Sequence, residues 1–215
     1  MLTKIKQDAS VVVPKERTLP VLRKAVQECR GCDHYRFATQ AVFGEVEAGP
    51  SEAEPKVSIM VIGEQPGDSE DKEGRPFVGP AGKLLDRCLE EAGIDRRNVY
   101  VTNTVKHFKW EPRGKRRLHA KPNSQEIAAC RAWLDAELEL VRPRVIACLG
   151  ATAAQTLLGR DFRITKRHGE VISGPLGNVV ATYHPSAVLR APDAATRQQM
   201  KQVLIDDLRV VARLI

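Results

Sequence analysis

Short apolar segments that look like buried strands alternate with helical patterns along most of this 215-residue chain. Strands are predicted at 56–64, 98–106 and 144–150, because each is a short, nearly continuous apolar run. Amphipathic or apolar helical patterns follow them at 80–93, 123–141 and 151–159, the second beginning at Asn123 or Ser124 as its cap. Two more strand-like segments, 169–173 and 178–184, precede a last helix at 194–215. Since this alternation builds parallel sheets covered on both faces, we expect an α/β fold.

The chain has the length of one well-packed α/β domain, so we expect residues 1–215 to form a single domain with an N-terminal arm at 1–19. A helix is predicted at 20–29, and the Glu-, Ala-, Pro- and Gly-rich stretch 45–55 is predicted to be a loop. No apolar run is long enough to span a membrane, and the first ten residues lack the apolar core of a signal peptide. We therefore expect a cytoplasmic protein without a membrane partner.

Positive charge is in excess and is unevenly distributed. The formal net charge is +7, which favours a polyanionic partner. Between Lys106 and Lys121 lie seven basic residues and one acidic residue, with Phe108 and Trp110 among them. This pattern is typical of a surface that follows a nucleic-acid backbone, and a solvated basic loop is the alternative.

The chain has five cysteines, and the sequence assigns a role to four of them. In a reducing compartment we do not expect disulfides. Cys29 and Cys32 form a C-x-x-C pair, which is typical of metal or cluster ligation. Cys88 and Cys148 lie in apolar patterns and are predicted to be core residues, whereas the local sequence leaves the role of Cys130 open.

Polar groups follow the ends of several predicted strands. "GEQPGD" at 63–68 follows the first strand, Asn103 lies near the end of the second, and "HPS" at 184–186 follows the last. The carboxyl ends of parallel strands meet at one edge of a sheet, so we expect these groups to converge there.

A single histidine, His119, lies within the basic sequence "GKRRLHAK" that follows Asn103. Lysine and arginine alone would suffice for a phosphate-binding loop. Nearby cations hold an imidazole neutral, and a neutral imidazole can act as a base or a nucleophile. The alternative is an incidental histidine in a solvated loop.

Taken together, "GEQPGDSEDKEGRPFVGPAGKLLD", "VYVTNTVK" and "YHPS" resemble the uracil-DNA glycosylase superfamily, and its iron–sulfur branch in particular. The first motif of that branch is usually G-E-[AG]-P-G, and the last is H-P-S. "KRRLH" is similar to the K-R-R-I-H loop of the UdgX type, with Leu118 in place of isoleucine. The resemblance implies a three-layer α/β/α sandwich around a central, mostly parallel four-stranded sheet, and a monomer that acts on uracil-containing DNA, single-stranded as well as duplex, at the bacterial nucleoid.

The resemblance also implies how uracil is held. Phe77 would stack on the flipped base. The Asn103 amide would pair with O4 and N3–H of uracil, a pattern that cytosine does not offer. His184 would hydrogen-bond O2 and stabilise the departing uracil anion. Further substrate-binding positions implied by the motifs are Gln65, Gly67, Asp68 and Ser186.

In the UdgX type the histidine of the basic loop bonds covalently to C1′ after uracil leaves, and His119 matches that histidine. Glu64 matches the carboxylate that orients the imidazole and takes up its proton. The neighbouring cations, Lys115, Arg116 and Arg117, would contact the DNA backbone. Two other functions stay open: a conventional turnover uracil-DNA glycosylase, and a cluster-containing DNA-binding protein without catalysis.

The resemblance implies a [4Fe–4S] cluster with a structural role. Cys29 and Cys32 match its first two ligands, and Cys130 matches the last. Where the branch usually has a further cysteine, this chain has His107. Imidazole is an acceptable iron ligand, although the same Cys₃His set can also bind zinc.

Overall fold

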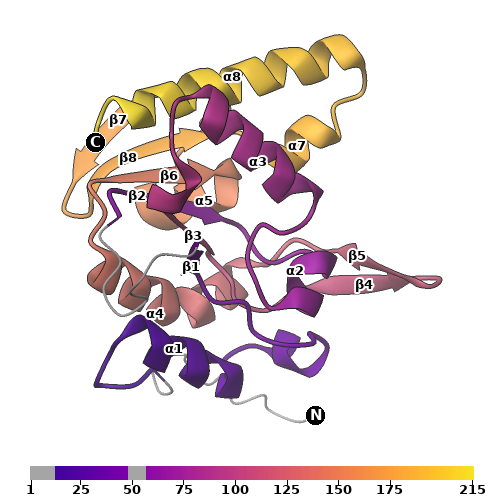
Figure 1. Ribbon diagram of the computed structural model, residues 1–215. Coiled ribbons are helices and arrows are strands. Elements are labelled where there is room, and N and C mark those ends of the chain that lie inside the picture. Colours follow the sequence, from indigo (N-terminus) through magenta and orange to yellow (C-terminus); the bar gives the residue numbers. More distant parts are fainter. Residues whose placement is uncertain (1–12, 48–56) are drawn as a thin grey trace.

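A six-stranded mixed sheet with the order β1-β3-β2-β6-β8-β7 forms the middle layer of the computed structural model, which describes residues 13–47 and 57–215 (Figure 1). Its four inner strands run parallel. They are β3 (Val99–Asn103), β2 (Ile59–Gly63), β6 (Val145–Leu149) and β8 (Gly177–Thr182). Two antiparallel edge strands, β1 (Glu45–Val46) and β7 (Val171–Gly174), complete the sheet.

The prediction of a four-stranded sheet is therefore wrong in the number of strands, although the inner four are parallel as expected. β7 returns beside β8 through the short connection from Gly174 to Gly177, so the pair is antiparallel. β1 has two residues, within a stretch predicted to be a loop. A strand of two residues is too short to produce a recognisable alternation in sequence.

Helices cover both faces of the sheet (Figure 1). The five predicted helices are present with slightly different ends: α1 (Leu19–Ala25), α3 (Pro80–Glu91), α4 (Ser124–Val141), α5 (Gly150–Leu158) and α8 (Ala194–Ala212). Three short helices were not predicted: α2 (Asp68–Glu73), α6 (Ile164–Arg167) and α7 (Pro185–Leu189). Single 3₁₀ turns lie at Val26–Glu28, Asp33–Arg36 and Arg96–Asn98. Among the described residues, no helix is long and apolar enough to cross a bilayer.

The predicted segments near the N-terminus are described in part. Residues 1–12 of the predicted arm and residues 48–55 of the predicted loop lie outside the described ranges. Leu19, the last residue of the predicted arm, is already the first residue of α1, which Thr18 caps through its hydroxyl.

The inner strands have two buried faces, which explains why they read as continuous apolar runs. In β2, Met60 and Ile62 pack in the apolar cluster shared with α1, α4 and α5. Ile59 and Val61 pack in the cluster shared with α3 and α8. Cys88 and Cys148 are fully buried in these clusters, as predicted.

The basic stretch forms an antiparallel hairpin that projects from the body of the protein (Figure 1). Its strands are β4 (Trp110–Arg113) and β5 (Arg116–His119), and neither was predicted. Trp110 pairs with His119 and Pro112 pairs with Arg117. Side chains alternate between the two faces of a strand, so His119 and Arg117 share one face and Arg116 lies on the other.

Candidate active site

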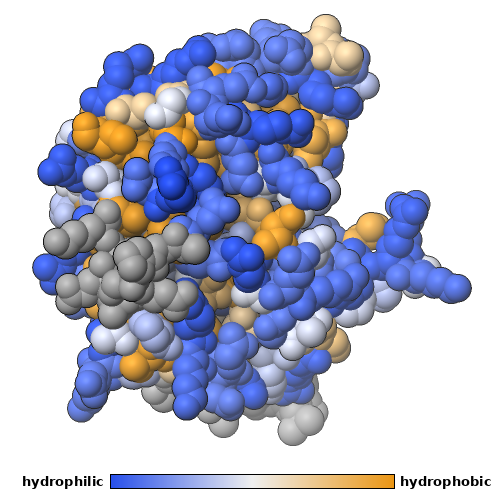
Figure 2. Space-filling view, viewed as in Figure 1, coloured by the Kyte–Doolittle hydropathy of each residue, from blue (hydrophilic) through white to orange (hydrophobic). Residues whose placement is uncertain are grey.

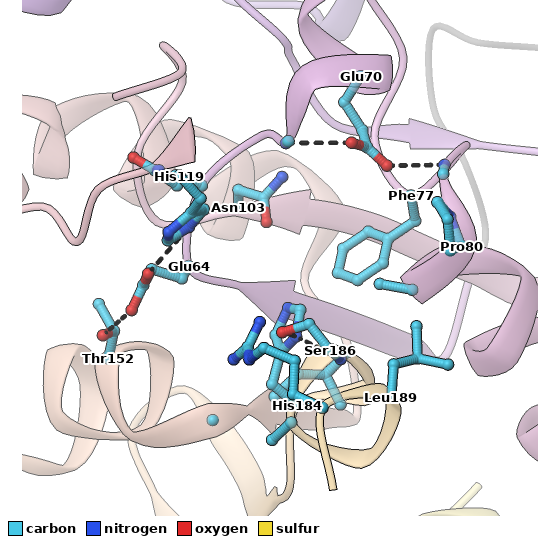
Figure 3. A pocket seen from close by; sticks show the side chains of 18 of the residues that line it. Glu64, Glu70, Phe77, Pro80, Asn103, His119, Thr152, His184, Ser186 and Leu189 are labelled. Atoms are coloured by element: carbon cyan, nitrogen blue, oxygen red, sulfur yellow. Dashed lines mark hydrogen bonds and ion pairs between the residues drawn. The ribbon is translucent and has the colours of Figure 1, made fainter. Parts of the chain in front are cut away.

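A pocket of about 810 Å³ opens at the carboxyl ends of the four inner strands (Figure 3). Glu64 follows β2, Asn103 ends β3, Thr152 follows β6, and His184 follows β8. This is the edge at which open α/β sheets place their ligands. All nine predicted catalytic and substrate-binding residues line the pocket: Glu64, Gln65, Gly67, Asp68, Phe77, Asn103, His119, His184 and Ser186.

Phe77 is held in the pocket wall by an unusual backbone conformation. Its φ is +58°, which is uncommon and strained for a bulky residue. A Cβ at Gly82 would lie 1.6 Å from the Phe77 carbonyl oxygen, so only glycine fits there. The Phe77 ring lies 6.0 Å from the His184 ring at an interplanar angle of 29°. The two rings therefore form adjacent parts of one wall.

Asn103 presents its amide to the pocket. The residue is 3% exposed, and its side chain has no hydrogen-bond partner among residues 13–47 and 57–215. A Cβ at Gly63 would lie 2.3 Å from Asn103 Oδ1 and 2.8 Å from Phe77 Cζ. The glycine therefore allows the amide and the aromatic ring to approach each other. The amide nitrogen and oxygen are not among the fully buried polar atoms that lack a partner in the described residues, so they face the pocket and can bond to water or to a ligand.

His184 is held as a neutral ring. Its Nδ1 accepts a hydrogen bond from the backbone N–H of Ser186 at 3.1 Å, and the Ser186 hydroxyl lies 2.8 Å from the same atom. Burial, with smaller contributions from the nearby Arg190 and His119, lowers the pKa of His184 to about 4. Because Nδ1 accepts a bond, the proton of the neutral ring is on Nε2, where it can be donated to a ligand.

His119 contacts the carboxylate that follows β2. Its Nε2 lies 3.3 Å from Glu64 Oε1, and the other carboxylate oxygen accepts a hydrogen bond from the Thr152 hydroxyl (Figure 3). Burial lowers the pKa of His119 and the Arg190 charge adds to this, whereas Glu64 opposes it. The ring is therefore neutral at physiological pH, and the His119 side chain remains 48% exposed at the pocket mouth.

Gln65 ties the hairpin to the sheet. Its amide donates to the carbonyls of Lys109 and Ala120 at 3.0 and 3.2 Å, and its Oε1 accepts from the Lys109 N–H. Both hairpin ends are therefore fixed beside Glu64. The Gln65 side chain holds His119 in place through the backbone, whereas sequence reasoning had assigned it to the substrate.

The loops around Gly67 and Gly79 are joined by Glu70. Glu70 Oε2 accepts from the Gly67 N–H at 3.0 Å, and Oε1 accepts from the Gly79 N–H at 2.8 Å (Figure 3). Asp68 instead pairs with Lys72 and with Arg117 of the hairpin. Sequence reasoning missed Glu70, because a glutamate three residues after a glycine reads as a helix-start residue.

Three of the seven cations in the basic stretch are paired within the fold. Lys106 pairs with the buried Glu137, and Lys109 pairs with Glu126. Arg117 pairs with Asp68 and with Asp71, each at 2.6 Å.

Phe108 is 1% exposed, and the Arg117 guanidinium lies over its ring. The interpretation of this whole stretch as one nucleic-acid surface was therefore wrong for these side chains. Lys115 and Arg116 lie exposed on the projecting hairpin, whose surface is largely hydrophilic (Figure 2).

Two further residues at the pocket were missed by sequence reasoning. Thr152 bonds to Glu64, and Arg190 lines the pocket and lowers the pKa of both histidines. Thr152 lies in an Ala-rich helix and reads as an ordinary helical residue. Its position just after the third predicted strand was the available signal, because loops at that edge converge.

The predicted cluster ligands lie in three segments that meet beside β3. Burial, with a smaller contribution from the neighbouring cysteines, raises the pKa of the Cys32 thiol to about 11 and that of Cys130 to about 12. Cys29 Sγ accepts from the Trp133 indole N–H, and Cys130 Sγ accepts from the Lys106 N–H.

The fourth predicted ligand, His107, is likewise buried, and burial lowers its pKa to about 4. Within the described part of the chain, no group of three or more His, Cys, Asp or Glu side chains is arranged to hold a single metal ion.

Comparisons with known proteins point in the same direction as this geometry. The sequence profile of the family described as the uracil DNA glycosylase superfamily matches residues 50–209. The chain is 34% identical over 206 residues to the Type-4 uracil-DNA glycosylase of Sulfurisphaera tokodaii, covering 92% of this chain and 84% of the relative. It is 35% identical over 196 residues to the Type-4 enzyme of Thermotoga maritima, covering 90% and 93% of the two chains.

A Type-5 uracil-DNA glycosylase of Pyrobaculum aerophilum is 30% identical over 163 residues, covering 68% of this chain and 69% of the relative. The profile match and the extent of these alignments show that this chain belongs to the uracil-DNA glycosylase superfamily.

Proposed function

We propose that this protein excises uracil from DNA and is then captured covalently, through His119, on C1′ of the resulting abasic sugar. The observation that supports capture most directly is the 3.3 Å contact between His119 Nε2 and Glu64 at the mouth of the pocket. A neutral imidazole oriented by a carboxylate is an activated nucleophile.

Base recognition would follow from three side chains in the pocket. Phe77 offers the aromatic face on which a flipped base stacks. The Asn103 amide has both a donor and an acceptor available, as uracil O4 and N3–H require. The neutral His184, with its proton on Nε2, would donate to uracil O2.

Cleavage of the glycosidic bond sends the electron pair of C1′–N1 onto uracil and leaves C1′ as an oxocarbenium-like centre. The Nε2–H of His184 would stabilise the negative charge that develops on the base. Arg190 adds positive charge at the same pocket, and it also keeps the pKa of His184 low.

Capture would then form one bond and release one proton. The lone pair of His119 forms the N–C1′ bond, and the proton on the other ring nitrogen passes to Glu64. The uracil anion takes a proton from solvent. The resulting N-linked sugar lacks a good leaving group, so the adduct is expected to persist.

We propose that Lys115 and Arg116 contact the DNA backbone, whereas Arg117 fixes the hairpin on α2. Arg116→Ala is expected to weaken DNA binding at all sequences and to reduce the salt slope by about one phosphate contact. Arg117→Ala removes a charge-assisted bond from the buried Asp71, which costs about 1.5–3 kcal/mol. The melting temperature of the Arg117→Ala variant is expected to fall by about 3–12 °C. Equal melting temperatures for the two variants would contradict this division of roles.

We also propose that Cys29, Cys32, His107 and Cys130 hold a [4Fe–4S] cluster. The donor set fits: the thiols lie close enough to raise one another's pKa, two sulfurs accept N–H bonds, and burial keeps His107 neutral. When bound, the cluster would hold the three segments together. The residues assigned to the reaction come from other segments.

The cluster assignment predicts a brown protein whose broad visible absorption is bleached by dithionite or acid. Cys130→Ala, which removes a buried ligand, is expected to lose colour and solubility together, whereas His107→Cys keeps the colour. Cys88→Ala is the control and stays brown, because Cys88 lies in the other apolar cluster, away from the one that holds Cys29 and Cys130. Stoichiometric zinc without iron in protein purified anaerobically would contradict the assignment.

Conventional turnover is the second candidate function. The observation that favours it is that relatives 34% and 35% identical over most of this chain are Type-4 uracil-DNA glycosylases. In that case water attacks C1′, and His119 contacts DNA without bonding to it.

A denaturing gel of the protein mixed with uracil-containing single-stranded DNA separates these functions. Covalent capture gives a shifted, heat-stable band. Turnover gives no such band but cleaves the DNA after alkali treatment, and binding without catalysis gives neither product. A DNA of the same sequence with thymine in place of uracil is the control.

A further inference from the structure

A fully buried ion pair is bonded to the backbone of Asn103, a residue that lines the pocket. The side chains of Lys106 and Glu137 are both 0% exposed, and Lys106 Nζ lies 2.5 Å from Glu137 Oε2. Two isolated charges in a protein interior cost several kcal/mol each, so such a pair persists only when further hydrogen bonds satisfy it. Since replacing a buried ion pair by apolar residues is often neutral or stabilising, stability alone is a weak explanation for this pair.

Each charge has the additional partners that it needs. Lys106 Nζ also donates to Thr102 Oγ1 and to the Asn103 backbone carbonyl, both at 2.7 Å. Glu137 Oε1 accepts from the Gly44 N–H at 2.9 Å and from the Tyr100 hydroxyl at 3.0 Å. The network thus spans α4, the segment before β1, and β3.

The pair acts on the backbone at the residue that carries the pocket amide. Asn103 ends β3, and its carbonyl accepts from the Lys106 ammonium, while the N–H of the next residue, Thr104, donates to the Gly63 carbonyl at 2.9 Å. Charge-assisted bonds are shorter and about twice as strong as neutral ones. The peptide that follows Asn103 is therefore held at its N–H by Gly63 and at its carbonyl by Lys106, and the lysine bond contributes to the direction in which the amide side chain points.

The same lysine joins the pocket to the cysteine segment. Its backbone N–H donates to Cys130 Sγ at 3.3 Å, while its side chain reaches Asn103. Glu137 lies on α4 together with Cys130. Although the sequence places Lys106 in the basic stretch, the burial of its side chain excludes contact with DNA.

We propose that the Lys106–Glu137 pair is a positioning device for Asn103, which holds the amide in the orientation that pairs with uracil. The inference rests on the proposed function, because it assigns the pair a role in uracil excision. A preorganised amide contributes to the transition state without reorganisation, and a misplacement of about 1 Å is enough to cost about 100-fold in rate. The pair itself touches no substrate.

The test uses Lys106→Met/Glu137→Gln, which removes both charges and keeps an amide oxygen for Gly44 and Tyr100. Single-turnover uracil release at saturating protein is measured on single-stranded uracil-DNA. We expect the rate to fall at least 10-fold, with the half-saturating concentration within about 2-fold of wild type. Phosphate contacts, which set affinity, lie elsewhere.

Arg96→Met is the matched control. Arg96 pairs with Asp86 and donates to the Val99 carbonyl, at the opposite end of the same strand. It therefore also removes an ion pair and a bond to the β3 backbone, but far from the pocket edge. Its excision rate is expected to equal that of wild type.

A double-mutant cycle with Asn103→Ala distinguishes positioning from general stability. If the pair acts through the amide, removing the pair in the Asn103→Ala background changes the excision rate by less than 2-fold. Multiplicative losses would overturn the proposal, as would a folded double variant with the wild-type rate. Should the double variant fail to fold, Glu137→Gln alone must show a smaller loss and the same non-additivity. A wild-type protein without excision would refute the proposed function itself, which is a separate outcome.

Discussion

His119→Ser is expected to abolish the heat-stable protein–DNA band completely while leaving uracil excision intact. The substitution removes the proposed nucleophile but none of the groups assigned to base recognition, Phe77, Asn103 and His184, which lie on other segments. The space vacated at the pocket mouth would admit water to C1′. The variant should therefore release uracil and leave an abasic site that alkali cleaves.

The matched control for this prediction is His168→Ser. His168 is another part-exposed histidine paired with a carboxylate, Asp207, at 3.0 Å, and it is absent from the residues that line the pocket. Its adduct band is expected to match wild type. A heat-stable band from His119→Ser would mean that a different residue is the nucleophile. If the wild-type protein instead released its product and turned over, the hairpin would serve only to bind DNA phosphates.

The pH dependence of capture follows from the same site. Capture requires the neutral imidazole, and burial lowers the pKa of His119 below its ordinary value of 6.5. The rate of adduct formation should therefore decline with falling pH at a lower pH than an ordinary imidazole would give, as the pH passes through that lowered pKa. Glu64→Gln removes the carboxylate that raises the pKa and accepts the proton, so it should slow capture at every pH.

The site residues that could be predicted from the sequence are those that lie at the ends of the strands. Glu64, Asn103 and His184 each follow an apolar run, and parallel pairing brings such ends to one edge whatever the connecting segments do. The inner strands were equally readable, because two buried faces produce continuous apolar runs.

The parts that sequence missed depend on contacts between distant segments. Arg117 and Arg116 are adjacent and chemically alike, yet the hairpin directs one to Asp71 and the other to solvent. Lys106 reads as a surface cation until Glu137, 31 residues away, is brought beside it. The role of Thr152 likewise depends on the hydrogen bond that its hydroxyl donates to the Glu64 carboxylate, which the sequence does not show.

Asn103→Ala is expected to lower uracil excision far more than DNA binding. One amide supplies both hydrogen bonds that distinguish uracil, and removing it from a buried base costs on the order of 2–4 kcal/mol, or about 30- to 900-fold in rate. Affinity should change little, since phosphate contacts dominate DNA binding. Single-turnover uracil release and DNA binding, measured on the same variant, separate the two effects.

Asn178→Ala is the control, because Asn178 lies on the parallel strand β8 at the end away from the pocket and bonds to Ser173. A rate equal to wild type is expected for it. If Asn103→Ala also kept the wild-type rate, uracil would have to be recognised outside this pocket. A loss of binding equal to the loss of rate would mean instead that the amide holds the DNA before the base is cleaved. A loss of rate without a loss of binding requires that the hairpin cations supply the affinity for DNA and that the Asn103 amide distinguishes uracil from other bases. Gln65 connects these two surfaces, because its amide bonds to both ends of the hairpin.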